Sequence, residues 1–166
     1  ASFSATQFKA LKTSQIESLT TDQAKALTTS QLAALSTAQM KAVETQDLAA
    51  MSTTQMRAIS SANIAAMSTT QINNMTTDQV ASMSAVQVKA LSKAQVTALN
   101  SDQVSNLTTT QVAAMGAAQL SSLTTAQVAS LNTDAVATLS SSQVPVPSAL
   151  NLVCLTKSFS VSHSRA

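Results

Sequence analysis

The sequence has few of the residue types that usually define an enzyme, a disulfide-linked domain or a membrane protein. Its 166 residues include one glycine, two prolines, one cysteine and neither tryptophan nor tyrosine. A single cysteine excludes an internal disulfide framework. Only 10% of the residues are charged and the net charge is +2, which gives no electrostatic basis for binding nucleic acid or an anionic membrane. No apolar run reaches the roughly 18 residues of a membrane span, so we expect no membrane insertion.

Patterns that carry catalysis or bind metals are also lacking. His163 is the only histidine and lies in a serine-rich end, so the many serines have no good partner base. The carboxylates are scattered except for Glu44 and Asp47, which we assign to capping of one helix. The sequence has no Cys/His zinc pattern, no Asp-rich calcium loop and no Gly-rich phosphate loop. We therefore expect no enzymatic activity and no cofactor.

What the sequence does have is an eight-residue repeat. The octapeptide that begins at Leu27 recurs without insertion or deletion from Phe3 to Val146, which gives eighteen copies. Numbered from the leading residue of each octad, positions 1 and 6 are apolar, positions 2 and 3 mostly Ser or Thr, position 5 mostly Gln and position 8 mostly Ala. A period this strict indicates a repeat architecture. We divide the chain into a repeat domain, residues 1–146, and an aperiodic tail, residues 147–166.

Each octad carries the signals that start a helix. Ser or Thr at position 2 and Gln at position 5 form a capping box, for example Thr28 with Gln31 and Thr108 with Gln111. Positions 1 and 6 then stand where a hydrophobic staple needs apolar side chains. Those positions predict the core, with these representative members: Leu27, Leu32, Leu35, Leu91, Val96, Leu99, Leu107 and Val112.

An octad has room for only about one and a half helical turns, at roughly 3.6 residues per turn. Helices this short are unstable alone and fold only when neighbouring copies cover their apolar residues. We therefore predict an all-α solenoid of very short helices, one restarted every eight residues. The alternative is a β-solenoid, because Thr and Val favour strands. However, with Gly116 as the only glycine, its tight corners would lack the usual turn residues.

Basic residues recur at position 7 of alternate octads. They are Lys9, Lys25, Lys41, Arg57 and Lys89. Their spacing in multiples of sixteen residues predicts that two octads form one structural unit, with the basic residues on one face. One hypothesis is that this face meets a partner. We favour the other interpretation, a solvated surface near the carboxyl ends of the short helices, where positive charge is favourable.

The two ends of the sequence provide further candidates for contact between molecules. Pro145 and Pro147 end the helical series, because proline lacks a backbone donor and biases its predecessor away from helix. Beyond them the tail contains Leu150, Leu152, Val153 and Leu155, which we interpret as an end cap, a strand or an arm that docks on a neighbouring molecule. At the other end the repeats begin at once, and we expect the first apolar layer to be open to a partner.

The consensus in residues 107–115, Leu-Thr-Thr-Thr-Gln-Val-Ala-Ala-Met, resembles the octapeptide arrays of large bacterial surface and adhesin-like proteins. The resemblance covers residues 3–144 and implies a stalk or an association surface. The octad also resembles the opening of the repeats in transcription-activator-like effectors. Those repeats are longer and carry a base-reading loop, which is missing here.

We hypothesise a structural protein, outside the cell or on its surface, whose copies stack head to tail into a filament. The partner is then the protein itself, because a solenoid end without a capping repeat leaves apolar surface uncovered and a head-to-tail contact generates open filaments. The main alternative is an adhesin stalk that binds a ligand. Ice binding through the threonine rows at positions 2 and 3, and nucleic-acid binding, are further alternatives.

Overall fold

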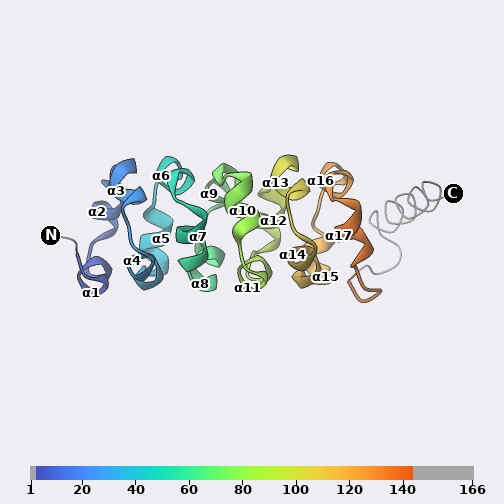
Figure 1. The fold of residues 1–166 in the computed structure, drawn as a ribbon, viewed down its shortest axis with the longest axis horizontal. Coiled ribbons are helices and arrows are strands. Elements are labelled where there is room, and N and C mark those ends of the chain that lie inside the picture. The colour runs from blue at the N-terminus through green and yellow to red at the C-terminus, as the bar shows by residue number, and fades with distance from the viewer. Residues whose placement is uncertain (1–2, 144–166) are drawn as a thin grey trace.

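The computed structural model describes residues 3–143, which form seventeen short α-helices and no β-strand (Figure 1). The prediction of an all-α solenoid is confirmed, and the β-solenoid alternative is wrong. In chain order the helices are α1 (Ala5–Lys9), α2 (Thr13–Glu17), α3 (Thr21–Lys25), α4 (Thr29–Ala34), α5 (Thr37–Ala42), α6 (Thr45–Ala50), α7 (Thr53–Ala58), α8 (Ser61–Ala66), α9 (Thr69–Asn74), α10 (Thr77–Ser82), α11 (Ala85–Lys89), α12 (Lys93–Ala98), α13 (Ser101–Ser105), α14 (Thr109–Ala114), α15 (Ala117–Leu120), α16 (Thr125–Ser130) and α17 (Thr133–Ala137).

Each helix begins at position 3 of its octad, and the residue at position 2 is its N-cap. In α4, the Thr28 hydroxyl accepts a hydrogen bond from the Gln31 backbone amide at 3.3 Å. In return, the Gln31 side-chain oxygen accepts from the Thr28 backbone amide at 2.7 Å. Thr108 and Gln111 form the same reciprocal pair at α14. The capping box therefore sets where each helix starts, because it satisfies backbone donors that the first turn leaves unpaired.

Two extended residues link most helices to the next. Met51 has φ −67° and ψ 146°, and Ser52 has φ −72° and ψ 161°, close to the polyproline II conformation. Any L-residue adopts these angles, so the chain changes direction without a glycine. Gly116, at the same position 2, also has a negative φ of −77°. The scarcity of glycine is thus compatible with a link every eight residues.

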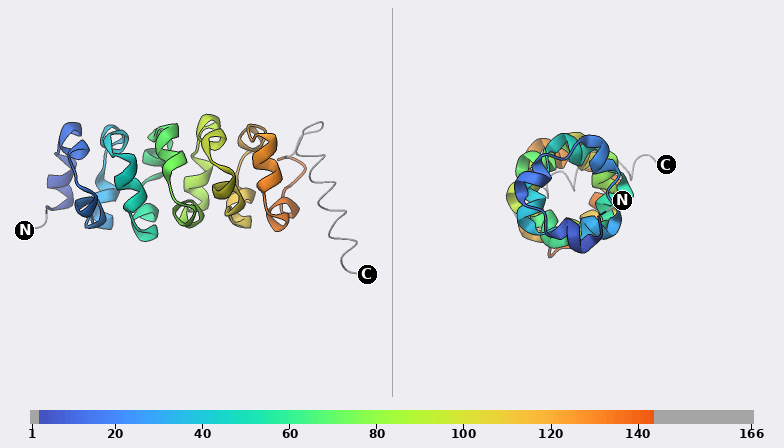
Figure 2. Two further views of the ribbon diagram at one scale, coloured as in Figure 1. Left: turned by 90° about the horizontal axis from the view of Figure 1, so that it is seen from above. Right: turned by 90° about the vertical axis from the view of Figure 1, so that its left-hand side faces the viewer.

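The helices wind into a tube. The helices that pack together are three apart in chain order, as α1 with α4, α4 with α7 and α14 with α17. Viewed from its end, the tube is a ring of helices (Figure 2). The expectation that two octads form one unit is wrong, because α1 and α3 lie at opposite edges of the tube in Figure 1. One superhelical turn takes more than three octads.

Positions 1 and 6 supply the core inside the tube. Position 6 is buried from the first copy onward, from Phe8 at 2% exposure to Val136 at 6%. Position 1 is buried from Leu35 to Leu131, and Leu27, which we expected in the core, is only partly buried. The other expected core residues are buried: Leu32, Leu35, Leu91, Val96, Leu99, Leu107 and Val112. The exception has a simple cause: within this sequence no earlier turn covers the first one.

Replacing Gly116 with Ser should raise the free energy of unfolding by about 0.5–1 kcal/mol, because it supplies a capping hydroxyl and removes backbone freedom from the unfolded chain. The space exists, since a β-carbon at residue 116 would have its nearest neighbour, Gln119 Oε1, at 3.9 Å. Urea denaturation followed by circular dichroism measures the change. Gly116→Ala is the control for the backbone contribution, and a Ser variant no more stable than the Ala variant would contradict the capping effect.

Candidate functional site

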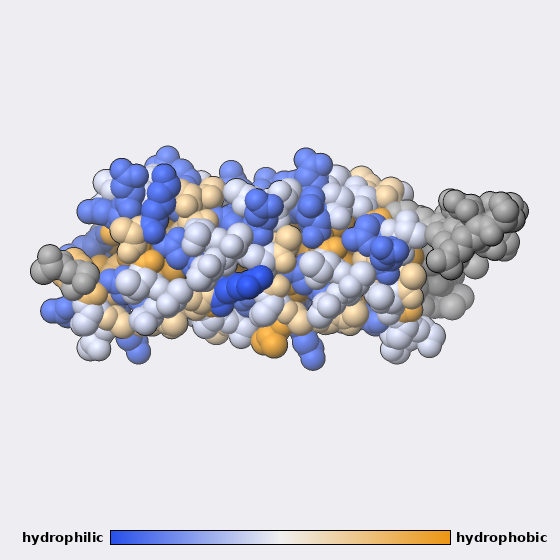
Figure 3. Space-filling view, in the orientation of Figure 1, coloured by the Kyte–Doolittle hydropathy of each residue, from blue (hydrophilic) through white to orange (hydrophobic). Residues whose placement is uncertain are grey.

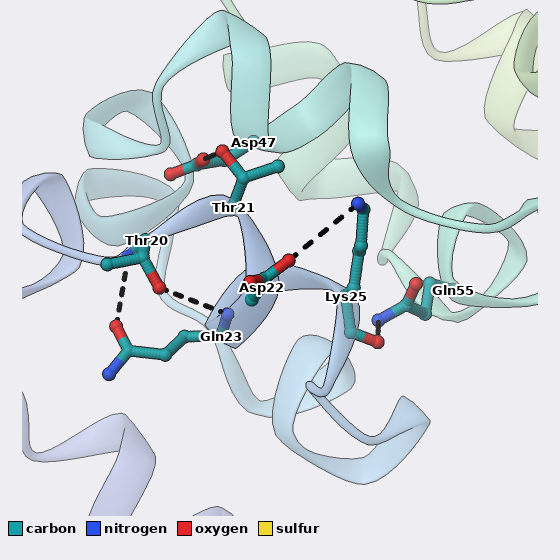
Figure 4. Close-up of polar contacts among 7 residues, drawn as sticks. All are labelled: Thr20, Thr21, Asp22, Gln23, Lys25, Asp47 and Gln55. Atoms are coloured by element: carbon teal, nitrogen blue, oxygen red, sulfur yellow. Dashed lines mark hydrogen bonds and ion pairs between the residues drawn. The ribbon is translucent and has the colours of Figure 1, made fainter.

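The glutamine at position 5 makes hydrogen bonds at both ends of its amide. In Gln55, the side-chain oxygen accepts from the Ser52 backbone amide at 2.8 Å, which caps α7. The Nε2 group donates to three carbonyl oxygens at the end of α3, those of Ala24 (3.0 Å), Lys25 (3.1 Å) and Leu27 (2.8 Å). Figure 4 shows the bond to Lys25. One side chain thus accepts a hydrogen bond at the amino end of its own helix and donates hydrogen bonds at the carboxyl end of a helix one superhelical turn earlier.

The same bridge recurs along the tube. The Nε2 donor reaches carbonyl groups 28 and 31 residues earlier in these residues: Gln39, Gln71, Gln79, Gln87, Gln95, Gln103, Gln111, Gln119 and Gln127. All nine are buried. Each bond contributes on the order of 0.5–1.5 kcal/mol net, and an unmade buried bond costs more. Because the separation is fixed, the bridges define the superhelical turn as between three and four octads.

Two octads without glutamine keep a bridge by other means. Asn63 has a shorter side chain and donates only to the Leu35 carbonyl, at 2.8 Å. Ala135 has no side-chain donor, but Asn132, three residues earlier in the same octad, donates to the Leu107 carbonyl at 3.0 Å. The bridge between turns is therefore preserved even where the sequence departs from its consensus.

Asp47 is the exception that lacks a bridge. We expected Glu44 and Asp47 to form a cap, but this is wrong, because the side chain of Glu44 makes no capping bond and α6 has no capping box. The Asp47 side chain is one carbon shorter than glutamine and has no donor. Its Oδ1 accepts from the Thr21 hydroxyl at 2.9 Å (Figure 4), while its buried Oδ2 has no partner. Asp47 is only 1% exposed, so this octad is a weak point of the array.

Position 7 makes a second kind of contact between turns, in the opposite direction. Arg57 Nε donates to the Ser82 carbonyl at 2.9 Å, and Asn73 donates to the Ala98 carbonyl at 2.9 Å, each 25 residues later in the chain. The basic residues at this position all lie in the last turn of a short helix: Lys9, Lys25, Lys41, Arg57 and Lys89. Lys25 also pairs with Asp22 at 3.8 Å, but both side chains are largely exposed, so the pair contributes little.

The first turn differs from the rest in its glutamines. The side-chain oxygens of Gln7, Gln15 and Gln23 accept from the N-cap amides at 2.9 Å, as position 5 does in the other octads that hold glutamine. Within residues 3–143, however, their Nε2 groups donate to nothing, and all three side chains are exposed. Figure 4 shows this for Gln23, whose amide nitrogen has no contact among the residues drawn. From Gln31 to Gln127 the corresponding glutamine side chains are buried.

Apolar side chains accompany these unused donors. Leu11, Leu19 and Leu27, at position 1 of successive octads, are only partly buried. Together with Phe8 and Gln23 they line a depression of about 290 Å³ at this end of the tube. Phe3, at its edge, is 59% exposed. The first turn therefore presents both the donors and the apolar residues that elsewhere contact a preceding turn.

Sequence reasoning missed the bridge, although a signal was present. A capping box accepts Glu as readily as Gln, yet position 5 holds no Glu in any copy. The preference for an amide indicates that the Nε2 donor is needed as well. The candidate tail residues Leu150, Leu152, Val153 and Leu155 lie outside the described residues, as does the boundary between repeat domain and tail.

The described part of the chain holds no group of three or more His, Cys, Asp or Glu side chains that could bind a metal ion. Nor does any helix between residues 3 and 143 have the length and apolar character needed to cross a membrane. The structure defines the chain as a helical solenoid of octapeptide units, connected between turns by glutamine side chains. Four segments match the ALTTAQ repeat, residues 1–37, 40–77, 72–109 and 112–146, and the chain belongs to this family. No curated protein and no solved structure matches it.

Replacing Gln95 with Glu should lower the free energy of unfolding by about 2–4 kcal/mol, because the variant keeps the cap but buries an unpaired carboxylate against carbonyl oxygens. In the protein, Gln95 is 2% exposed and its Nε2 lies 2.8 Å from the Met67 oxygen. Urea denaturation measures the loss. The matched control is Gln15→Glu, where no bridge exists and the change should stay within about 0.5 kcal/mol. Equal losses at both sites would contradict the role of the bridge.

Replacing Asp47 with Gln should stabilise the protein by about 1–3 kcal/mol, because it removes a buried oxygen without a partner and restores a donor toward the preceding turn. Asp47→Asn should give a smaller gain, by analogy with Asn63, which makes one bridging bond. Thermal and urea denaturation of the three proteins test this order. A Gln variant less stable than the natural chain would show that the Thr21 contact matters more than the bridge.

Proposed function

We propose that the protein is structural and associates with copies of itself, head to tail, into a filament outside the cell or on its surface. The observation that supports this is the first described turn, which no other part of residues 3–143 covers. Three amide donors are unused within residues 3–143, and three partly exposed leucines lie beside them. Burying apolar surface of this kind is worth roughly 25 cal/mol per Å², which favours a partner that covers it.

The side of the tube offers much less for association. Figure 3 shows a lateral surface of mainly polar or weakly apolar residues, with the strongly apolar colour confined largely to crevices between turns. Among the described residues, the only large hydrophobic side chains that are mostly exposed are Phe3, at the end, and Val86, on the side. A single exposed valine is ordinary for a soluble protein. End-to-end contact is therefore favoured over side-by-side contact.

The location outside the cell rests on the resemblance of the octad to the arrays of bacterial surface and adhesin-like proteins, and on the low charge. A surface rich in Ser, Thr and Gln with 10% charged residues repels its own copies weakly, which suits a protein that assembles. The partner is the protein itself.

A second candidate, a ligand-binding stalk, is favoured by grooves that repeat along the tube. One groove, of about 640 Å³, is lined by Glu17, Ser68 and Gln71 among others. Another, of about 400 Å³, is lined by residues forty positions later, including Arg57 and Gln111. Because equivalent positions carry opposite charges, successive grooves are chemically different. A stalk would use such grooves while its copies remained separate.

Sedimentation velocity and electron microscopy over a wide range of protein concentration distinguish the two functions. We expect the sedimentation coefficient to rise with concentration, and micrographs to show unbranched fibres as wide as one tube, with a helical circular dichroism spectrum throughout. Short, separate rods at every concentration would contradict self-assembly and favour the ligand-binding stalk.

A further inference from the structure

We infer that Asp47 and the residues that end helix α2 form a binding site for a calcium ion. Asp47 supplies the carboxylate, and the backbone carbonyl groups of Glu17 and Leu19 supply neutral oxygen ligands. The cation takes the place of the amide donor that joins successive turns elsewhere in the tube. This inference does not depend on the proposed association of copies.

The backbone carbonyl group of Leu19 differs from its equivalents. At position 1 of every other octad from Phe3 to Met115, the carbonyl group accepts a hydrogen bond from a side chain 28 residues later, or in one case 25 residues later. Within residues 3–143, no hydrogen bond reaches the Leu19 carbonyl. The residue that should hold its donor, 28 positions later, is Asp47.

The Asp47 carboxylate lies within reach of this carbonyl group. Asn63 has a side chain of the same length at the same position 5, and its Nδ2 lies 2.8 Å from the carbonyl oxygen of Leu35, 28 residues earlier. By the same separation, Asp47 faces Leu19. The hydroxyl of Thr21, two residues after Leu19, donates to Asp47 Oδ1 at 2.9 Å and holds the carboxylate beside this link (Figure 4). The buried Oδ2 has no partner, so oxygen atoms without a donor meet where other copies place an amide nitrogen.

Oxygen atoms that converge without a hydrogen donor suit a hard cation. Ca²⁺ takes about six to eight oxygen ligands from carboxylates, carbonyl groups and water, in flexible geometry, whereas Mg²⁺ demands a nearly ideal octahedron. A bound cation also compensates the charge of Asp47, whose burial is otherwise costly. One carboxylate with neutral carbonyl groups is a weak set of ligands, and we expect a dissociation constant of about 0.1–1 mM.

A groove beside this position gives a cation access to it. The groove, of about 640 Å³, is lined by Glu17, Lys41 and Glu44 among others. Together with Asp47 these side chains carry three negative charges and one positive charge, a net −2 that a divalent cation balances. Such a negative surface raises the local concentration of cations. The equivalent groove forty residues later has Arg57 in place of Glu17, and no carboxylate lines it.

The test measures calcium binding to the full chain by equilibrium dialysis, and folding stability by urea denaturation with and without calcium. Asp47→Asn removes the charge and supplies a donor, as Asn63 does, so the variant should fold. The matched control is Asp78→Asn, which removes an exposed carboxylate from the first turn of another short helix. Magnesium and sodium chloride at the same ionic strength separate specific binding from screening.

We expect the natural chain to bind a single calcium ion, and its folding equilibrium constant to rise about tenfold when the calcium concentration is about ten times the dissociation constant. Asp47→Asn should lose both effects, and Asp78→Asn should retain them. An Asp47→Asn variant that binds calcium as the natural chain does, or an equal loss in Asp78→Asn, would place the ion elsewhere and overturn the inference. So would a natural chain that calcium does not stabilise but mild acid does, because a proton on Asp47 would then supply the missing donor.

Discussion

The whole fold depends on one amide side chain that bonds at both ends. Helices of four to six residues leave most of their backbone donors and acceptors outside any intrahelical bond. In most bridged copies the glutamine at position 5 satisfies a donor at the start of its own helix and acceptors at the end of a helix 28 to 31 residues earlier. The interaction therefore couples the start of each bridged helix to the end of a helix one superhelical turn earlier.

This coupling explains why the octad tolerates so little variation at position 5 and so much at positions 4 and 7. Replacements at position 5 that retain a donor, such as Asn63, keep a bridge. Asp47, which has none, leaves an unpaired buried oxygen. Positions 4 and 7 lie on the outside, where a contact such as that of Arg57 with the Ser82 carbonyl adds to the bridge without being required by it.

The octad register, the helix starts and the buried positions could be predicted from the sequence because capping and stapling are local, within five residues of each other. The pairing of turns could not, since nothing local fixes how far the chain rotates between one short helix and the next. For this reason the sixteen-residue spacing of the basic residues led to a wrong prediction that they share one face. Lys9 in α1 and Lys25 in α3 are sixteen residues apart, but these two helices lie on different sides of the tube. Leu27 resembles Leu35 in sequence, but no preceding turn within residues 3–143 covers it, and so it is partly exposed.

The absence of glycine from nearly every link has a consequence for how such a protein changes in length. Because the octad register is kept through every link, gaining or losing one whole octad brings another glutamine opposite the same carbonyl groups, and every other bridge is kept. A change of any other size would displace all bridges across that point. The array can therefore lengthen or shorten by genetic recombination in steps of less than a third of a superhelical turn, and each step rotates one end of the rod relative to the other.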